Sequence, residues 1–386
     1  MSFERFYGGK KVLITGHTGF KGSWLTEWLL MMGAKVTGFA LPPATEPALF
    51  DQLGLAKRCD HRIGDIRDCA LVRKVIHEIR PDVIFHLAAQ PLVRLSYAQP
   101  VETYETNVMG TAHVLDALRD ADWVCAAVMI TTDKVYENRE LVHAYREDEP
   151  LGGFDPYSSS KACAELVIQS YRNSYFNPAK IKSQDTSHLT SHISRLTPHP
   201  SPPLVGVASA RAGNVIGGGD WALDRIVPDC IRALAKGEVI VVRNSHATRP
   251  WQHVLEPLSG YLLLGEKLYS SLTSDVSRLT SYASAFNFGP ALSSNRPVGE
   301  LVKEILKHWP GRWEDRPVPN ALHEASLLNL STDKAHHELG WVARWDFGKT
   351  VEATVGLYRQ TVTGSGDPVR GIVQTQIKEF LQGSEW

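Results

Sequence analysis

The segment KVLITGHTGFKG, residues 11–22, decides the fold. Its first five residues, Lys11–Thr15, are predicted as a strand, and three glycines then lead into an amphipathic helix at about Ser23–Met32. Glycines let the backbone approach a pyrophosphate, and a helix start offers free N–H groups and a positive dipole end. The GxxGxxG spacing therefore indicates a phosphate-binding turn, although glycines that merely turn a strand into a helix remain the alternative.

Strands and helices alternate from this turn through residue 176, which predicts an α/β fold with a doubly wound, Rossmann-like parallel sheet. Further strands are expected at Lys35–Ala40, before Gly64–Asp68, and at Asp82–Leu87, Val124–Ile130 and Leu204–Ala210, with helices around Ala70–Ile79 and Asn107–Arg119. The polar segment 178–203 interrupts the pattern and is interpreted as a surface excursion. Residues 1–210 are thus expected to form mainly a dinucleotide-binding domain.

Residues 211–386 mix shorter elements and are expected to form a smaller α+β substrate lobe, interleaved with the sheet. Helices are predicted at Ile226–Lys236, Pro257–Leu268, Val298–Trp309, Asp333–Leu339 and Phe347–Gln360, strands at Val239–Arg243 and Ala285–Phe288, and a loop at 270–282. Residues 364–386 show too weak a pattern for an assignment.

Composition excludes several classes of protein. The net charge of −1 over 386 residues gives no electrostatic footprint for nucleic acid. No apolar run approaches the roughly 18–20 residues of a membrane span. Five cysteines without metal-ligand spacing suggest reduced thiols and no metal site. A soluble, cytoplasmic protein is expected.

Polar residues follow the apolar fifth strand at TTDKVY, Thr131–Tyr136. Ligands of open α/β sheets bind outside the carboxyl ends of the strands, so Thr132, Asp133 and Lys134 are expected to face a reaction site. The alternative is an exposed Asp133–Lys134 ion pair of little energetic value.

A second polar motif, YSSSK, places Tyr157 and Lys161 one helical turn apart if a helix begins at Pro156. A lysine ammonium near a phenol favours the phenolate and lowers its pKa from about 10. Such a tyrosine can take a proton from a substrate hydroxyl while hydride leaves the same carbon. An ordinary solvated pair is the alternative.

In combination, these motifs resemble the extended short-chain dehydrogenase/reductase family over about residues 10–360. The resemblance implies NAD as cofactor, although neither an acid nor an arginine follows the second strand to support NAD over NADP. The cofactor-binding residues that it implies are Gly16, Thr18, Gly19, Phe20, Gly22, Asp65, Ile66, Leu87, Ala88, Ala89, Tyr157 and Lys161. His17 departs from the small residue common in the family's glycine loop.

Within the family the chain is most similar to the nucleotide-sugar 4,6-dehydratases, with CDP-glucose as the implied substrate. That resemblance implies C4 oxidation by NAD⁺ with Tyr157 and Lys161, loss of water across C5 and C6, and hydride return to C6, giving CDP-4-dehydro-6-deoxy-glucose for deoxysugar and lipopolysaccharide biosynthesis. Asp133 acts as an acid only when protonated, Lys134 as a base only when uncharged, and Thr132 is expected to hydrogen-bond O4. Relatives acting on dTDP sugars place Glu where Lys134 stands.

The same resemblance implies that Asn214, Arg225 and Arg249 bind the nucleotide-diphosphate sugar, and that the protein forms a homodimer or higher homo-oligomer. Arginine suits bidentate contact with phosphate. Three alternatives remain, and the first is a 4,6-dehydratase that acts on another nucleotide sugar. A 4-epimerase shares Tyr157 and Lys161 but needs no acid and base at C5 and C6, and a non-catalytic dinucleotide sensor needs only the fold.

Overall fold

A seven-stranded parallel sheet, in the order β11-β6-β5-β4-β1-β2-β3, forms the centre of the molecule. The computed structural model describes residues 3–177, 205–317, 327–364 and 368–382, so the predicted excursion at 178–203 lies outside the described residues. The strands are β1 (Lys11–Thr15), β2 (Lys35–Ala40), β3 (Asp60–Ile63), β4 (Val83–His86), β5 (Cys125–Ile130), β6 (Val205–Arg211) and β11 (Ala285–Asn287). This confirms the predicted doubly wound α/β class.

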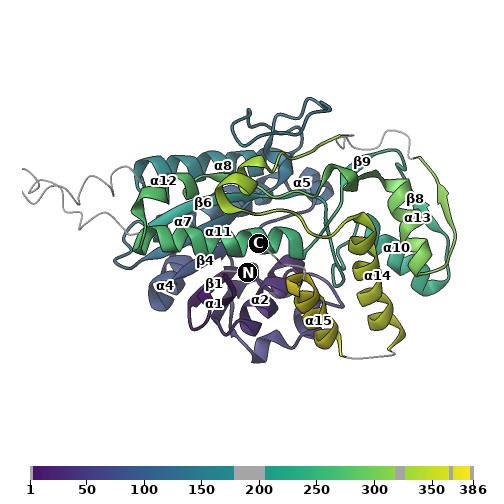
Figure 1. Cartoon of the computed structure of the whole chain (residues 1–386), viewed down its shortest axis with the longest axis horizontal. Coiled ribbons are helices and arrows are strands. Elements are labelled where there is room, and N and C mark those ends of the chain that lie inside the picture. The colour runs from purple at the N-terminus through teal and green to yellow at the C-terminus, as the bar shows by residue number, and fades with distance from the viewer. Residues whose placement is uncertain (1–2, 178–204, 318–326, 365–367, 383–386) are drawn as a thin grey trace, which may run out of the picture.

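Helices cover both faces of the sheet (Figure 1). One layer contains α4 (Cys69–Ile79), α7 (Gly110–Ala117) and α8 (Pro156–Ser174), and the other contains α2 (Phe20–Met31) and α11 (Leu255–Thr273). Each layer packs on its own apolar cluster, which explains why every residue of β5 is buried. A strand buried on both faces reads as a continuous apolar run, and this is how β5 is recognised in the sequence.

A smaller lobe lies at one end of the sheet, built on α10 (Ile226–Lys236), α13 (Val298–His308) and α14 (Phe347–Thr363) around a separate apolar cluster (Figure 1). The same half of the chain also supplies β11 and α11 to the main sheet. The lobe's strands are β7 (Val215–Ile216), β8 (Ile240–Val242), β9 (Thr248–Pro250), β10 (Gln252–His253), β12 (Asn295–Pro297) and β13 (Trp313–Asp315). Short helical segments elsewhere in the chain include α1 (Phe3–Phe6), α3 (Leu49–Gln52), η1 (Leu55–Lys57), α5 (Val93–Ala98), α6 (Pro100–Tyr104), η3 (Asp133–Val135) and η5 (Leu292–Ser294).

Three predicted elements need correction, and one unassigned segment contains a helix. The predicted loop at 270–282 is wrong, because α11 continues to Thr273 and is followed by η4 (Val276–Arg278) and α12 (Leu279–Tyr282). Leu279 and Tyr282 are buried in the main core, and this packing overrides the polar composition of the segment.

The helix predicted at Asn107–Arg119 starts with a π-helical turn, η2 (Glu105–Met109), and continues as α7 (Gly110–Ala117). The helix predicted at Asp333–Leu339 is likewise a π-turn, η6 (Ala335–Leu339), at its end. The unassigned tail contains α15 (Val369–Gln382), whose Val373, Ile377 and Phe380 are buried in the main core beside α2.

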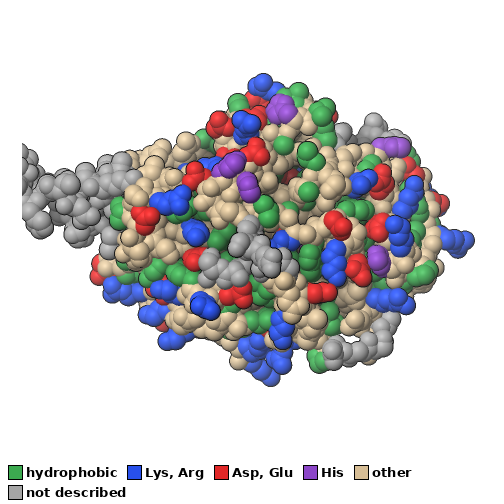
Figure 2. All heavy atoms as spheres, viewed as in Figure 1, with side chains coloured by type: hydrophobic (Ala, Val, Ile, Leu, Met, Phe, Trp, Pro, Cys, Tyr) green, Lys and Arg blue, Asp and Glu red, His purple; other side chains and the backbone are tan. Residues whose placement is uncertain are grey.

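The surface carries charges of both signs interspersed on the face shown in Figure 2. Among the described residues, no helix is both long enough and apolar enough to span a membrane.

Candidate active site

A cavity of about 1150 Å³ lies at the carboxyl edge of the sheet, between the glycine loop and the smaller lobe. It brings together every residue that the sequence predicts for the site. These are Gly16, Thr18, Gly19, Phe20, Gly22, Asp65, Ile66, Leu87, Ala88, Ala89, Thr132, Asp133, Lys134, Tyr157, Lys161, Asn214, Arg225 and Arg249. Their individual roles remain predictions.

The glycine loop is shaped for close approach by a ligand. Gly16 has φ +78°, and a Cβ there would lie 2.7 Å from the backbone nitrogen of Ala88. A Cβ on Gly22 would lie 2.7 Å from the Cα of His17, so helix α2 can start tight against the loop only with glycine. The helix N-cap, Gly19, provides no side-chain cap, which leaves N–H groups at the cavity. The loop therefore fits a pyrophosphate.

His17 does not line the cavity. Its buried Nε2 lies 2.6 Å from Nδ1 of His61, and its ring fills the space beside Gly38 of β2. Burial lowers the pKa of His17 to about 4, with the neighbouring His61 acting in the same direction. This histidine is thus a neutral packing residue beneath the loop.

Asp133 is held in one orientation by three neighbours. Thr132 Oγ1 donates a hydrogen bond to its Oδ1 at 2.9 Å, and Asn214 Nδ2 donates to its Oδ2 at 3.3 Å. A Cβ on Gly213 would overlap its carboxylate. Asp133 is also buried, although it lines the cavity. A carboxyl group so placed is oriented for proton transfer to a bound substrate.

Tyr157 and Lys161 both project from the first turns of α8, as predicted. The helix begins because Asp155 caps it, accepting a hydrogen bond from the backbone of Ser158 at 2.9 Å. Ser96 Oγ accepts one from the Tyr157 backbone N–H at 3.1 Å, and Lys161 Nζ donates to the carbonyl of Ile130 at 3.4 Å. The motif is therefore fixed to the end of β5.

The expected lowering of the Tyr157 pKa is not found. Burial raises the pKa of this phenol to about 12, opposed by its interaction with Thr132 and reinforced by the negative charge of Asp133. Lys161, whose own pKa burial lowers to about 8, keeps most of its charge at neutral pH but does not reverse this shift. Without ligands the tyrosine is therefore a neutral phenol, and a positive charge must be supplied before it acts as a base.

Lys134 provides a cation beside that phenol. Its Nζ lies 6.0 Å from the centroid of the Tyr157 ring, and the residue is partly exposed to the cavity. Phenol, carboxyl group and amine thus surround one space, with Asp133 buried and Lys134 partly exposed.

The far end of the cavity carries the basic residues expected to bind diphosphate. Arg225 forms an ion pair with Asp220 at 2.6 Å, while Arg249, on β9, donates a hydrogen bond to the carbonyl of Thr248 at 2.9 Å. Arg94 and Arg243 also line the cavity and both contact Asp224. Sequence reasoning missed these two arginines, because only the folded chain brings them to the cavity.

Lys21 is a second residue that the sequence interpretation passed over. It stands inside the glycine loop and lines the cavity. Burial lowers its pKa to about 8, and the positive charge of Arg225 acts in the same direction while Asp133 opposes it. A lysine between the glycines is itself a signal, because it adds a cation where the loop approaches phosphate.

Comparison with known proteins identifies relatives along nearly the whole chain. A family model described as GDP-mannose 4,6 dehydratase matches residues 13–188. The chain is 44% identical to CDP-glucose 4,6-dehydratase of Salmonella typhimurium over 367 residues, which cover 94% of each protein.

Solved structures share the fold at lower identity. A dTDP-glucose 4,6-dehydratase from Streptomyces venezuelae, solved with NAD bound, superimposes with a TM-score of 0.71 at 23% identity, covering 93% of this chain and 99% of that one. UDP-glucose 4-epimerase from Thermotoga maritima gives a TM-score of 0.71 at 18% identity, covering 91% and 99%. These structures alone do not separate a dehydratase from an epimerase. The extended identity to the Salmonella enzyme does, and the chain belongs to the nucleotide-sugar 4,6-dehydratase family of extended short-chain dehydrogenases/reductases.

Proposed function

We propose that this protein is a hydro-lyase that converts CDP-glucose into CDP-4-dehydro-6-deoxy-glucose, with NAD as a tightly held cofactor. The observation that carries the proposal is the convergence of Thr132, Asp133 and Lys134 on the same space as Tyr157. The identity to CDP-glucose 4,6-dehydratase of Salmonella typhimurium supports the choice of substrate.

The glycine loop and the residues around it fit a dinucleotide. The uncapped start of α2 and the Gly16 turn would hold the pyrophosphate, and Leu87–Ala89 would lie along the ribose and the nicotinamide ring. Asp65, held by Arg67 at 2.6 Å, would lie on the adenine side. When bound, NAD⁺ supplies the chemistry of accepting hydride from C4 and returning it to C6.

Tyr157 would take the proton from O4 as the C4 ketone forms. Its neutral phenol needs nearby positive charge for this step. The Arg225 guanidinium, whose charge lowers the pKa of the phenol, and the Lys161 ammonium would provide it. The Thr132 hydroxyl donates a hydrogen bond to Asp133 in the absence of substrate. It would donate to the ketone oxygen instead once that bond to Asp133 is broken. The ketone then acidifies the proton on C5.

Asp133 and Lys134 would perform the elimination. Lys134, in its uncharged form, takes the C5 proton and later returns it to the same carbon. Asp133 gives its proton to the C6 hydroxyl, so that the C6–O bond breaks and water leaves. Over a whole turnover, one proton is lost from O4 and one is gained by the leaving water. Tyr157 must therefore pass the proton that it takes from O4 to Asp133, which has given its own proton to the C6 hydroxyl. Thr132 lies between the two groups and offers the path.

An epimerase would need only Tyr157 and Lys161, and the fold is shared with UDP-glucose 4-epimerase. The experiment that separates the two is mass spectrometry of the product from CDP-glucose, with dTDP-, UDP- and GDP-glucose as parallel substrates. The proposal expects loss of one water from CDP-glucose and fastest turnover with it. Conversion without mass loss would establish the epimerase, and faster dehydration of another nucleotide sugar would overturn the base assignment.

The proposal also includes that the protein forms a homodimer and that it acts in the cytoplasm, in deoxysugar biosynthesis. Apolar side chains project to solvent from α6, η2 and α8, namely Val101, Met109 and Leu166, which are 69%, 50% and 53% exposed. Helices in this part of the fold pair with a second copy in the family, and covering these side chains favours association. The five free cysteines suit a reducing compartment.

A further inference from the structure

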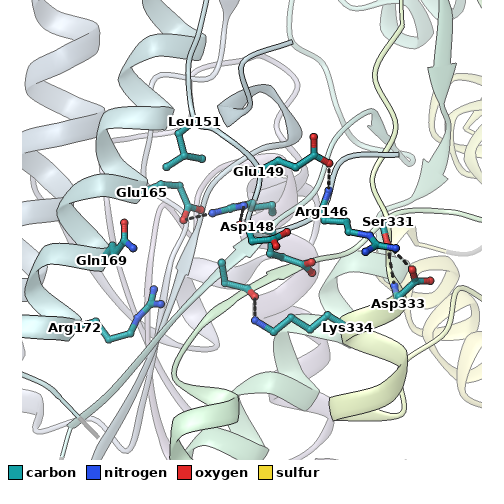
Figure 3. Close-up of a pocket in the computed structure, with 13 residues that line it drawn as sticks. Arg146, Asp148, Glu149, Leu151, Glu165, Gln169, Arg172, Ser331, Asp333 and Lys334 are labelled. Atoms are coloured by element: carbon teal, nitrogen blue, oxygen red, sulfur yellow. Dashed lines mark hydrogen bonds and ion pairs between the residues drawn. The ribbon is translucent and has the colours of Figure 1, made fainter. Parts of the chain in front are cut away.

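A second cavity, of about 590 Å³, is lined by residues from α8, from the end of β6 and from the start of the edge strand β11 (Figure 3). Its wall is formed by α8, by the loop that follows η3, by the start of β11 and by the segment before η6. It shares no lining residue with the candidate active site.

Two guanidinium groups that line this cavity, those of Arg172 and Arg211, have an Nε donor without a hydrogen-bond partner among the described residues. The Nε atom of Arg172 is shut off from solvent and has no hydrogen-bond partner among the described residues. Burial lowers the pKa of Arg172 to about 10, while the Glu165 charge opposes the shift, so the guanidinium remains charged at neutral pH. In Figure 3 it projects from α8 without a dashed contact. Arg172 as a whole is only partly buried, but a donor shut off from water is costly unless an acceptor joins it.

The inner wall holds more positive than negative charge. Arg211 and Glu165 neutralise each other in a buried ion pair of 3.0 Å. Lys334 adds a second cation, whose Nζ donates, within the part of the chain that the structure describes, to two neutral oxygens, Ser284 Oγ at 2.9 Å and the Ala285 carbonyl at 2.8 Å. Glu147 is the one remaining inner carboxyl group among the lining residues, and burial raises its pKa. Arg172 and Lys334 therefore face a single acid.

The mouth of the cavity has the opposite character. Asp148, Glu149 and Asp333 stand there with Arg146, and all but Glu149 are exposed. Solvent screens these charges more than those of the inner wall. A ligand with one compact anionic group suits this pattern, whereas one with several separate anionic groups would meet repulsion at the mouth.

The Glu165–Arg211 pair also reaches the candidate active site. Glu165 accepts a hydrogen bond from Thr131 Oγ1 at 2.5 Å, next to the catalytic candidate Thr132, and its charge acts on Lys161 one turn earlier in α8. Arg211 ends β6 two residues before Gly213, which packs on Asp133. An anion beside Arg211 and Arg172 would change the field at both ends of the reaction site.

We propose that this second cavity is a regulatory site for a small metabolite with a single oxyanion group, a carboxylate or a phosphate monoester, held by Arg172 and Lys334. The Glu165–Arg211 pair couples it to the reaction site. The proposal goes beyond the dehydratase function and does not depend on which nucleotide sugar is the substrate.

The test is isothermal titration calorimetry on the full-length protein saturated with NAD and CDP, so that the active site is filled. The probes are L-glutamine for the carboxylate, glucose 1-phosphate for the monoester and citrate for a polyanion. Saturable binding of glutamine or of glucose 1-phosphate is expected, with citrate at least tenfold weaker. Which of the two binds identifies the source of the oxyanion. Absence of saturable binding by both would overturn the proposal.

Variants locate the binding. Arg172→Gln and Gln169→Glu should each weaken it at least tenfold, the second by placing a negative charge at an exposed position that folding tolerates. Two matched controls should bind as the wild type does. Gln169→Ala changes the same position without adding a charge, and Arg312→Gln removes an exposed arginine that lies outside the cavity. Unchanged binding by both test variants would place the ligand elsewhere.

Steady-state kinetics test the coupling. A saturating amount of the bound probe should change kcat or KM at least twofold in the wild type and leave Arg172→Gln unchanged. Equal kinetics with and without bound probe would overturn the regulatory role, whatever the outcome of the substrate assay.

Discussion

Gly213 packs so closely on Asp133 that a Cβ at position 213 would overlap the carboxylate oxygens. The backbone of β6's extension thus forms the floor beneath the proposed acid, and the orientation of Asp133 depends on a residue with no side chain.

We expect Gly213→Ala to displace the Asp133 carboxyl group and to lower kcat by about a hundredfold, since misplacing a catalytic group has effects of this order. NAD binding should persist, because the glycine loop is untouched. Gly356→Ala on α14 is the control, since its added Cβ meets nothing within 4 Å. A normal kcat for Gly213→Ala would show that Asp133 need not hold this position.

Lys134→Ala should separate oxidation from elimination. Transient NADH absorbance should still appear, while deuterium exchange at C5 and product formation fall by about a hundredfold or more. Lys303→Ala, an exposed lysine on α13, should behave as the wild type does. If the NADH signal and the exchange were lost together, Lys134 would not be the C5 base.

Lys21 should make binding of NAD, whose pyrophosphate the glycine loop would hold, depend on pH. Its pKa is lowered to about 8, so its positive charge is present below pH 8 and is lost above it. Lys21→Met should weaken binding about tenfold at pH 7, the loss of about one charge-assisted contact, and much less at pH 9. Lys21→Arg should keep the affinity at both values. Equal weakening by methionine at pH 7 and pH 9 would contradict an electrostatic role.

Buried neutral histidines should make the fold sensitive to acid. Burial lowers the pKa of His253 from 6.5 to about 3, so unfolding takes up a proton below pH 6.5 and the stability present above that pH is progressively lost as the pH falls. At pH 5 this one group costs about 2 kcal/mol, that is, about 1.5 pH units at 1.36 kcal/mol each.

His253→Gln should remove that share of the pH dependence. In the wild type, His253 Nδ1 accepts a hydrogen bond from the Leu255 backbone N–H at 3.3 Å, and the glutamine side chain retains an acceptor for it. Urea unfolding at pH 7 and pH 5 measures the change in the free energy of unfolding. The same loss between the two pH values in variant and wild type would show that His253 does not contribute.

Leu166→Glu should dissociate the proposed dimer. It places a charge among apolar side chains that a second copy would cover, whereas Leu292→Glu, at a leucine 73% exposed on η5, is the control. Light scattering after size exclusion should give monomer mass for the first and dimer mass for the second. A wild-type monomer would refute the dimer outright.

Local sequence patterns predicted the sheet well, because β1 and β2 are apolar runs bounded by turn residues and coincide with Lys11–Thr15 and Lys35–Ala40. Elements whose burial depends on distant partners were missed. α15 is weakly patterned and becomes a helix against α2, and α12 is polar apart from the two residues it buries.

The candidate site shows the same division. Residues carried by motifs, such as Tyr157 and Asp133, were predicted and line one cavity. The raised pKa of Tyr157 was not predicted, because it depends on burial by the whole fold. The Glu165–Arg211 ion pair joins residues that are 46 positions apart, so a local sequence pattern cannot predict it.

The contribution of β11 and α11 to the central sheet has a consequence for synthesis of the chain. Residues 1–210 emerge from the ribosome first, yet the part of one sheet face that α11 covers stays open until Thr273 has been added, and one edge of β6 stays open until β11 ends at Asn287. At translation speeds of about 5–20 residues per second, that interval is on the order of ten seconds. During it the nascent chain presents an open strand edge and bare apolar surface, the features that chaperones recognise, so its yield in the cell should depend on them more than its final stability suggests.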